Sequence, residues 1–148
     1  MQLKDLISRV RAYTRDTTGS LFTQDDIHAF CNEGLERMKQ IIPELIGMRK
    51  LLTNTDEINI LPEQYKHLVA VYSASRCFSQ DEQQYQASTY MNEFEAKMDE
   101  LKRLIANGDI ILRDDEGNEI PLVSTGANDY VKDIYFTKLD EVGSDVAK

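Results

Sequence analysis

Residues 62–106 read PEQYKHLVAVYSASRCFSQDEQQYQASTYMNEFEAKMDELKRLIA and contain two helical patterns joined by a short polar link. The first pattern, from Pro62 to about Phe78, is apolar on nearly every side. A helix without a wide polar face belongs in the centre of a domain. Proline suits the first helical position because its φ is fixed and its missing N–H needs no partner there. We therefore predict a buried central helix.

The second pattern follows the link, in which Ser79 and Glu82 predict a helix cap. Its apolar residues recur at steps of four and three, like the seam of a coiled coil. They are Ala87, Met91, Phe94, Met98, Leu101 and Ile105. Asn107-Gly108 predicts the end of this helix. Because a short link joins two long helices, we expect an antiparallel hairpin. The apolar seam packs either inside the monomer or between subunits.

Two amphipathic helices are predicted before this hairpin. In residues 2–14 the apolar side chains fall at helical spacing, and they are Leu3, Leu6, Ile7, Val10 and Tyr13. The next helix opens at Phe22-Thr23-Gln24-Asp25-Asp26-Ile27, where the Thr23 hydroxyl is expected to cap the first turn. Pro43 is expected to end it, since a proline in the next turn clashes with the preceding carbonyls.

Two short β-hairpins are predicted outside the helices. Residues 48–61 carry apolar residues on both sides of the polar turn Asn54–Glu57. We expect this turn to be exposed, so that Asp56→Ala changes stability little. Residues 110–123 carry two apolar runs around an acidic turn, with Gly117 at its left-handed position.

The predicted fold class is mainly α, with a four-helix bundle-like core, one or two short β-hairpins and an extended C-terminal arm. The helical core covers residues 1–108, and the second hairpin and the arm cover 109–148. Behind a spacer, Ser124–Asn128, the arm carries an isolated apolar cluster: Tyr130, Val131, Ile134, Tyr135 and Phe136. Aromatic residues are common interface anchors, so this cluster is the predicted partner-binding site. The alternative is that it folds back on its own core as a short helix or strand.

Charge and composition exclude several classes. The chain has 148 residues and a net charge of −9, of which residues 109–148 contribute −6. This balance argues against non-specific binding to nucleic acid. The sequence has no apolar run of membrane-spanning length and starts with charged residues, so we expect no membrane association and a cytoplasmic location. Cys31 and Cys77 are expected to be small buried hydrophobes without a redox role.

The sequence lacks the common motifs for binding nucleotides, zinc and calcium. The seven glycines form neither a dinucleotide-binding turn nor a P-loop. His28 and His67 belong to no zinc pattern. In a calcium-loop register set by Gly117, the first and twelfth positions would be Leu112 and Val123, which offer no side-chain oxygen. We expect no cofactor, no metal and no enzymatic activity.

Three motifs stand in order over roughly residues 1–105. Leu3-x-x-Leu6-Ile7 comes first, Phe22–Ile27 followed by Asn32-Glu33 comes next, and a short hairpin then leads into Leu61-Pro62-Glu63-Gln64-Tyr65. In this order and spacing the chain resembles the head–tail connector, or adaptor, proteins of tailed bacteriophages. The resemblance implies a four-helix core, a homo-oligomeric ring of about a dozen subunits and no catalytic residue. It also implies a C-terminal extension that docks on the portal protein and a face that receives a downstream tail-completion protein.

Our leading hypothesis is therefore a structural virion protein, made in the host cytoplasm, whose ring connects the capsid portal to the tail at the head–tail junction. The genome would pass through the ring without specific binding. The alternative is a small helical protein-binding or chaperone-like module that accepts a partner helix. Four methionines, Met38, Met48, Met91 and Met98, are either ordinary core residues or a soft groove for such a helix.

The acidic balance generates a first prediction. Duplex DNA at physiological salt should show no mobility shift with this protein, because an acidic surface repels phosphates. Tight binding that weakens with added salt would contradict it.

Overall fold

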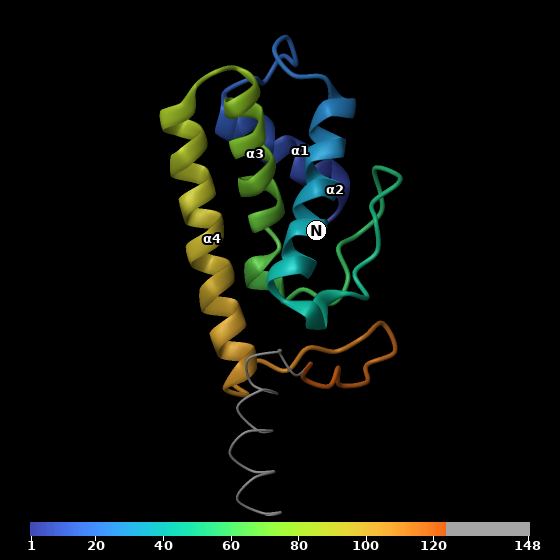
Figure 1. The fold of residues 1–148 in the computed structure, drawn as a ribbon. Helices are drawn as coiled ribbons and strands as arrows, with labels where there is room; N and C mark the ends of the chain where they lie inside the picture. Colours follow the sequence, from blue (N-terminus) through green and yellow to red (C-terminus); the bar gives the residue numbers. More distant parts are fainter. Residues whose placement is uncertain (124–148) are drawn as a thin grey trace, which may run out of the picture.

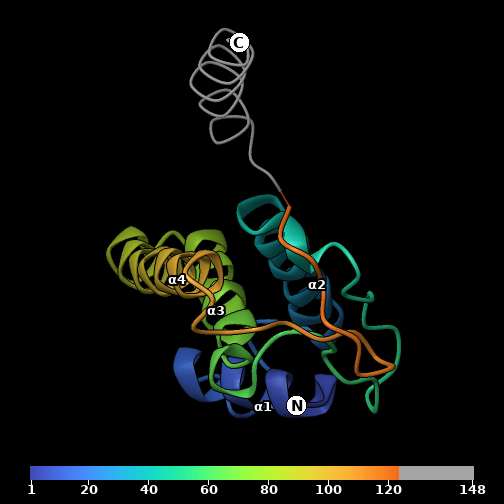
Figure 2. The ribbon, with the colours of Figure 1, turned by 90° about the horizontal axis from the view of Figure 1, so that it is seen from below.

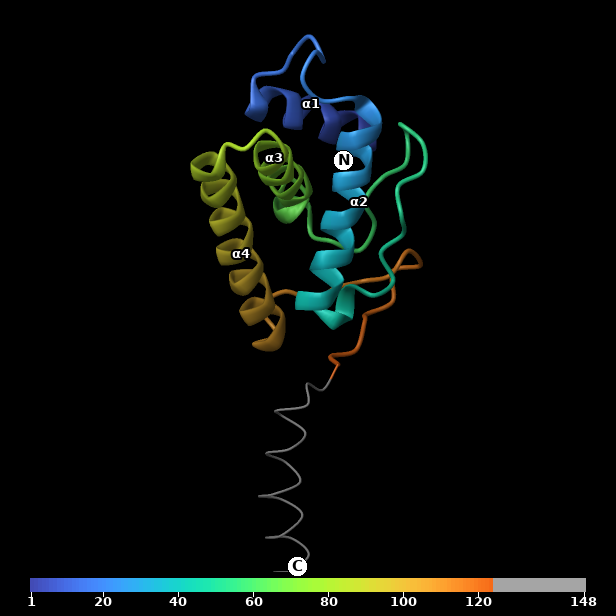
Figure 3. The ribbon, with the colours of Figure 1, turned by 45° about the horizontal axis from the view of Figure 1, so that its top comes forward.

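The computed structural model describes residues 1–123, which form four α-helices and two short 3-10 helices (Figure 1). The elements are α1 (Leu3–Thr14), α2 (Gln24–Ile41), η1 (Pro43–Leu45), η2 (Glu63–Tyr65), α3 (Leu68–Gln80) and α4 (Gln84–Ala106). Helices α3 and α4 lie antiparallel, α2 lies on the other side of α3, and α1 crosses one end of the group (Figures 1 and 3). The mainly helical fold class is confirmed.

Helix α3 occupies the centre of the domain, as predicted, but it begins at Leu68 and not at Pro62, because residues 63–65 form the separate 3-10 helix η2. Seen from below, it lies between α4 on one side and α1 and α2 on the other (Figure 2). Ten of its 13 residues are buried. Ser73 Oγ donates to the Ile27 carbonyl of α2 at 3.4 Å, and Ser75 Oγ donates to the Ala87 carbonyl of α4 at 2.7 Å. The two buried serine hydroxyls therefore find partners on the neighbouring helices.

The predicted seam of α4 packs inside the chain. Its members are buried except for the half-buried Met91. The fully buried Phe94 ring meets the Tyr72 ring of α3 edge-on, with 5.1 Å between the ring centroids. The helix ends at Ala106, and Gly108 follows with a φ of 82°. The seam is therefore an internal contact, and the predicted helix end is confirmed.

The link between α3 and α4 differs from the prediction. Ser79 does not cap α4, because it lies in the last turn of α3. The chain reverses at Glu82, whose φ of 59° is left-handed, and the Gln83 N–H donates to the Phe78 carbonyl at 2.8 Å. Backbone groups of the turn thus close the end of α3. Helix α4 begins without a side-chain cap.

The start and the end of α2 are confirmed. The Thr23 hydroxyl accepts the Asp26 N–H at 3.1 Å, which satisfies one of the free donors of the first turn. The helix ends at Ile41, and Pro43 opens η1 directly afterwards.

The connection from α1 to α2 depends on a buried carboxylate, which the sequence pattern did not reveal. Asp16 is 2% exposed and accepts the backbone N–H groups of Ser20, Leu21 and Phe22 at 2.9–3.2 Å. Arg11 Nη1 also donates to it at 3.2 Å. Burial acts to raise the pKa of Asp16, but the three backbone donors and the guanidinium outweigh it and lower the pKa.

The first predicted β-hairpin does not form, since residues 48–61 contain no strand. The Asn32 side chain of α2 accepts the Leu51 N–H at 2.8 Å and donates to the Leu51 carbonyl at 2.9 Å. The Leu3 N–H donates to the Asp56 carbonyl at 2.9 Å. Because α2 and the N-terminus satisfy these backbone groups, the segment needs no second strand as a partner.

The polar turn of this segment is exposed at Asn54, Thr55 and Glu57, as expected. Asp56 differs, because its carboxylate accepts the N–H groups of Leu52 at 2.7 Å and Thr53 at 2.9 Å, and also the Thr53 hydroxyl. The hydrogen bond from the Thr53 backbone N–H lowers the pKa of Asp56 most, and the one from the Leu52 N–H lowers it further. The expectation that Asp56→Ala has little effect is therefore revised.

Residues 110–122, named the 110–122 loop from here on, double back around the acidic turn (Figure 1). They form one antiparallel bridge between Arg113 and Glu119, and the Ile120 N–H donates to the Leu112 carbonyl at 2.8 Å. Gly117 has a φ of 85°, which confirms its predicted left-handed backbone. Apart from isolated bridges, residues 1–123 contain no β-strand.

The packing of α4 on α3 predicts that Phe94→Ala destabilises the protein by about 3–5 kcal/mol, because truncation leaves a cavity beside Tyr72. The matched control is Tyr85→Ala on the same helix, where the side chain is 82% exposed and we expect a change within about 0.5 kcal/mol. Denaturant titration measures both. A loss below about 1 kcal/mol for Phe94→Ala would show that the seam does not hold the core.

The hydrogen bonds of Asp56 predict that Asp56→Ala lowers the melting temperature more than the neighbouring control Glu57→Ala. The folded-state pKa of Asp56 lies below its ordinary value, so the stabilisation is fully present above the ordinary value near 4. This stabilisation is lost as the pH falls through the lower, folded-state pKa of Asp56. Thermal melts should therefore show a gap between wild type and Asp56→Ala at neutral pH that narrows in strong acid. An equal melting temperature at pH 7 would contradict the structural role of Asp56.

Candidate interaction surface

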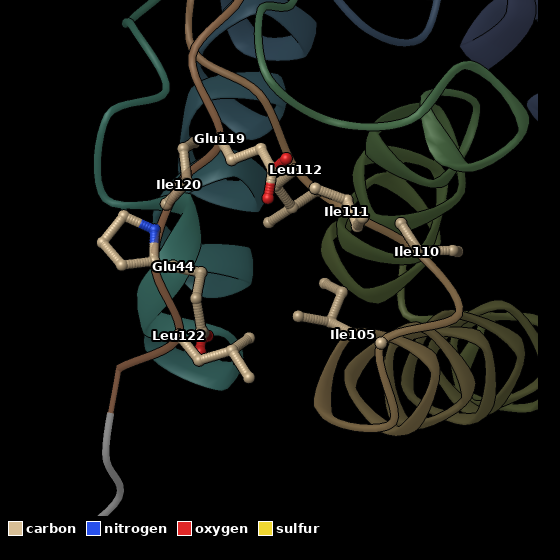
Figure 4. Close-up of a pocket in the computed structure, with 10 residues that line it drawn as sticks. Glu44, Ile105, Ile110, Ile111, Leu112, Glu119, Ile120 and Leu122 are labelled. Carbon is tan, nitrogen blue, oxygen red and sulfur yellow. The ribbon is translucent and has the colours of Figure 1, made fainter.

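An apolar groove lies at the end of the domain where the 110–122 loop passes η1 and the end of α4 (Figure 4). It encloses about 380 Å³ and is lined by Glu44, Ile105, Gly108, Ile110, Ile111, Leu112, Glu119, Ile120, Pro121 and Leu122. Ile105 of α4 and Leu122 face each other across the hollow (Figure 4). Volume and apolar lining are typical of a binding site.

One wall of the groove is fixed by burial. Leu112 is 3% exposed and belongs to the hydrophobic core, and Ile110 and Ile120 pack against that core. The other side chains of the loop point less inward, since Ile111 is 54% exposed and Leu122 59% exposed. The loop therefore contributes both to the core and to the open groove.

Polar contacts fix the turn of the loop beside residues 47–60. The Asp115 carboxylate pairs with the Arg49 guanidinium and accepts from the Asn59 amide at 3.2 Å. Asn59 Oδ1 in turn accepts the Arg49 N–H at 2.9 Å. These surface contacts set the direction of the loop more than they stabilise the protein.

The backbone beside this contact is strained. Ile60 has a φ of 67°, which is an outlier for a β-branched residue and costs about 1–3 kcal/mol. Its Cδ1 lies so close to Gly47 that a Cβ at that position would be 2.9 Å away. Because Cδ1 is the far end of the Ile60 side chain, a small shift of that side chain would relieve the contact.

The rim of the groove carries negative charge. Glu44 of η1 accepts the Val123 N–H at 2.9 Å. This hydrogen bond holds the last of the described residues against η1. Glu119 lies on the rim as well, and its carboxylate is 3.8 Å from Arg113. The groove therefore joins an apolar floor to carboxylates at its edge.

In the acidic turn whose spacing was compared with a calcium loop, a carboxylate accepts hydrogen bonds from backbone N–H groups of the same turn. Asp114 Oδ1 accepts the N–H groups of Glu116 at 3.0 Å and Asn118 at 2.9 Å. Within residues 1–123 no three His, Cys, Asp or Glu side chains are grouped so that they could hold a metal ion.

A second cleft, of about 560 Å³, lies between α1, α3 and α4 beside Arg15. Its rings are already paired, since Tyr90 lies with its ring centroid 5.5 Å from those of both Tyr13 and Phe78. Burial is the main cause that raises the pKa of Tyr90, and the neighbouring Tyr13 raises it further. This aromatic cluster joins three helices and leaves less free apolar surface than the groove does.

The two cysteines are buried, as expected. Burial raises the pKa of Cys31 and of Cys77 to about 12, so neither is an available thiolate at neutral pH. His28 is also engaged structurally, because its Nε2 lies 2.6 Å from the Leu51 carbonyl.

The predicted partner-binding residues, Tyr130, Val131, Ile134, Tyr135 and Phe136, lie outside the described residues, as do the spacer and the rest of the arm. The sequence pattern does not reveal the groove, because Ile110–Leu112 and Ile120–Val123 predict strands. Their apolar character was the available signal. Its meaning depends on Ile105 and Glu44, which the fold brings beside them from distant parts of the sequence.

Comparison with protein-family models, curated proteins and solved structures finds no match for this chain. Among residues 1–123, no helix has the length and apolar character needed to cross a membrane.

The anchoring of the 110–122 loop generates a prediction with a matched pair of variants. Leu112→Ala should release the loop, because truncation of a buried leucine costs about 2–5 kcal/mol. Ile111→Ala, at the exposed neighbouring position, should leave it attached. Amide hydrogen exchange at Ile120, whose N–H donates to Leu112, should become at least about tenfold faster in Leu112→Ala only. Equal exchange in both variants would show that Leu112 is not the anchor.

Proposed function

We propose that this protein is a head–tail adaptor, a structural subunit that forms a ring and joins the portal of a phage capsid to its tail. The carrying observation is the end of the domain near the groove, where exposed apolar side chains gather and the arm departs. Leu122 and Val123 are 59% and 45% exposed there, and Ile46, two residues after Glu44 of the groove rim, is 73% exposed. Such surface is typical of a protein contact.

The order of elements supports the proposal. Leu3, Leu6 and Ile7 are buried residues of α1, and Phe22–Ile27 covers the capped start of α2. Leu61–Tyr65 leads through η2 into α3. Leu3–Ile7, Phe22–Ile27 and Leu61–Tyr65 thus fall at the starts of helices or directly before them, whereas Asn32-Glu33 lies inside α2 and the hairpin expected before Leu61 does not form.

The chemistry of the described core also favours a structural role. The buried hydroxyls of Thr14, Ser73 and Ser75 donate to backbone carbonyls, and the thiols are held in their neutral form. These groups serve packing, so the proposal assigns the protein no enzymatic activity.

In the proposed assembly the arm residues Tyr130–Phe136 contact the portal, and another face receives the downstream tail-completion protein. The ring has about a dozen subunits with cyclic symmetry. The acidic subunits let the genome slide through without specific binding. The site of action is the head–tail junction of the virion, after assembly in the host cytoplasm.

Two truncations test the role of the arm. The chain ending at Ala127 should keep its melting temperature within a few degrees but fail to co-sediment with the portal protein encoded by the same genome. The control chain ending at Leu139 keeps the apolar cluster and loses only the polar end, so it should still co-sediment. Collapse of the Ala127 chain would make the arm part of the core, and undiminished portal binding would exclude it as the docking element.

The groove favours a second candidate function, the module that accepts a partner helix, because its apolar floor is open. A monomer that binds an unrelated amphipathic helical peptide and does not bind the portal protein would favour this module over the adaptor.

A further inference from the structure

We propose that, in the free subunit, the groove holds the chain's own segment Tyr130–Phe136. This inference goes beyond the adaptor function and does not depend on a portal. It assigns the groove an occupant and the arm a resting place before it meets a partner.

The groove offers apolar surface that lacks a cover in residues 1–123. Ile111 and Leu122 are more than half exposed on its walls, and Leu122 faces Ile105 across the hollow (Figure 4). The arm carries the complementary surface, since Tyr130–Phe136 contains three aromatic and two β-branched side chains. Bringing the two together removes apolar area of both from water.

The chain leaves the described part directly at the groove. Leu122 lines the groove, and Glu44 on its rim accepts the Val123 N–H at 2.9 Å. Six residues, 124–129, separate that point from Tyr130. At about 3.3–3.6 Å per residue they reach roughly 20 Å. Gly126 and Asn128 suit a reversal of direction, so the segment can return to the groove.

The short connection also decides which copy of the segment binds. A flexible linker of this length gives an effective concentration in the millimolar range. A second copy at micromolar concentration competes poorly with it. The chain's own segment is therefore the favoured occupant over a neighbour's.

Charge neither favours nor opposes this contact. Lys132 and Asp133 cancel within the segment, and Glu119 on the groove rim already pairs with Arg113 at 3.8 Å. Docking on a portal then requires the segment to leave the groove first, which keeps the apolar cluster covered until a partner competes for it.

Paramagnetic NMR on the full chain tests this inference. A nitroxide on Thr137→Cys is placed beside the segment, and the native Cys31 and Cys77 are 0% exposed and resist labelling. We expect the methyl signals of Ile105, Ile110 and Leu122 to lose more than half of their intensity and to recover when the nitroxide is reduced. The methyl signals of Leu21, in the connection between α1 and α2, should stay unchanged. Replacing Tyr130, Tyr135 and Phe136 by serine should abolish the effect.

A mixing experiment identifies the copy. Methyl-labelled chain without nitroxide is mixed with nitroxide-bearing chain without isotope, and we expect no broadening of the groove methyls. Broadening in the mixture would assign the groove to a second copy and overturn the inference. An absence of broadening in the single-chain sample would also overturn it. Neither result involves a portal, so failure here leaves the adaptor function to its own test.

A peptide supplies an independent measurement. Residues 128–138 added to the chain that ends at Ala127 should shift the same three groove methyls, and the triple-serine peptide should not. Shifts that are equal for both peptides, or shifts confined to other parts of the domain, would contradict the inference.

Discussion

The structure depends on the burial of α3. Its sequence between Leu68 and Phe78 is so apolar that most of its surface has to be covered, and α1, α2 and α4 together provide the cover. Burial of this kind is the main favourable contribution to folding. The two buried serines of α3, Ser73 and Ser75, do not weaken it, because each donates to a carbonyl of a neighbouring helix. Each of the other three helices is thus placed by its contact with this one.

The segments outside the helices are held by polar side chains. Asp16 gathers three backbone N–H groups between α1 and α2, Asn32 holds both backbone groups of Leu51, and Asp115 ties the 110–122 loop to Arg49 and Asn59. Asp16 and Asn32 replace missing backbone partners, whereas Asp115 makes its contacts with side chains. These contacts place the 110–122 loop at the end of the domain, where it lines the groove and residues 1–123 end. In our proposal, this position lets the C-terminal segment bind either its own core or a partner.

The helices could be predicted from the sequence because their signals are local. The Thr23 cap, the Gly108 end and the seam through Phe94 each need only neighbouring residues, and each is confirmed. The 48–61 segment could not be predicted in the same way, since its alternating apolar residues favour a strand while its actual hydrogen-bond partners, such as Asn32, lie far away in the sequence. The groove was hidden for the same reason. Its apolar runs were visible, but Ile105 and Glu44 join them only in the folded chain.

The central claim is that this helical domain is a ring-forming adaptor. The absolute mass of the intact protein, measured by multi-angle light scattering over a wide concentration range, alone and with the portal protein encoded by the same genome, tests it most directly. We expect one closed species of about a dozen subunits on the portal, whatever the oligomeric state of the free subunit. A protein that stays monomeric at every concentration and never elutes with the portal would contradict it.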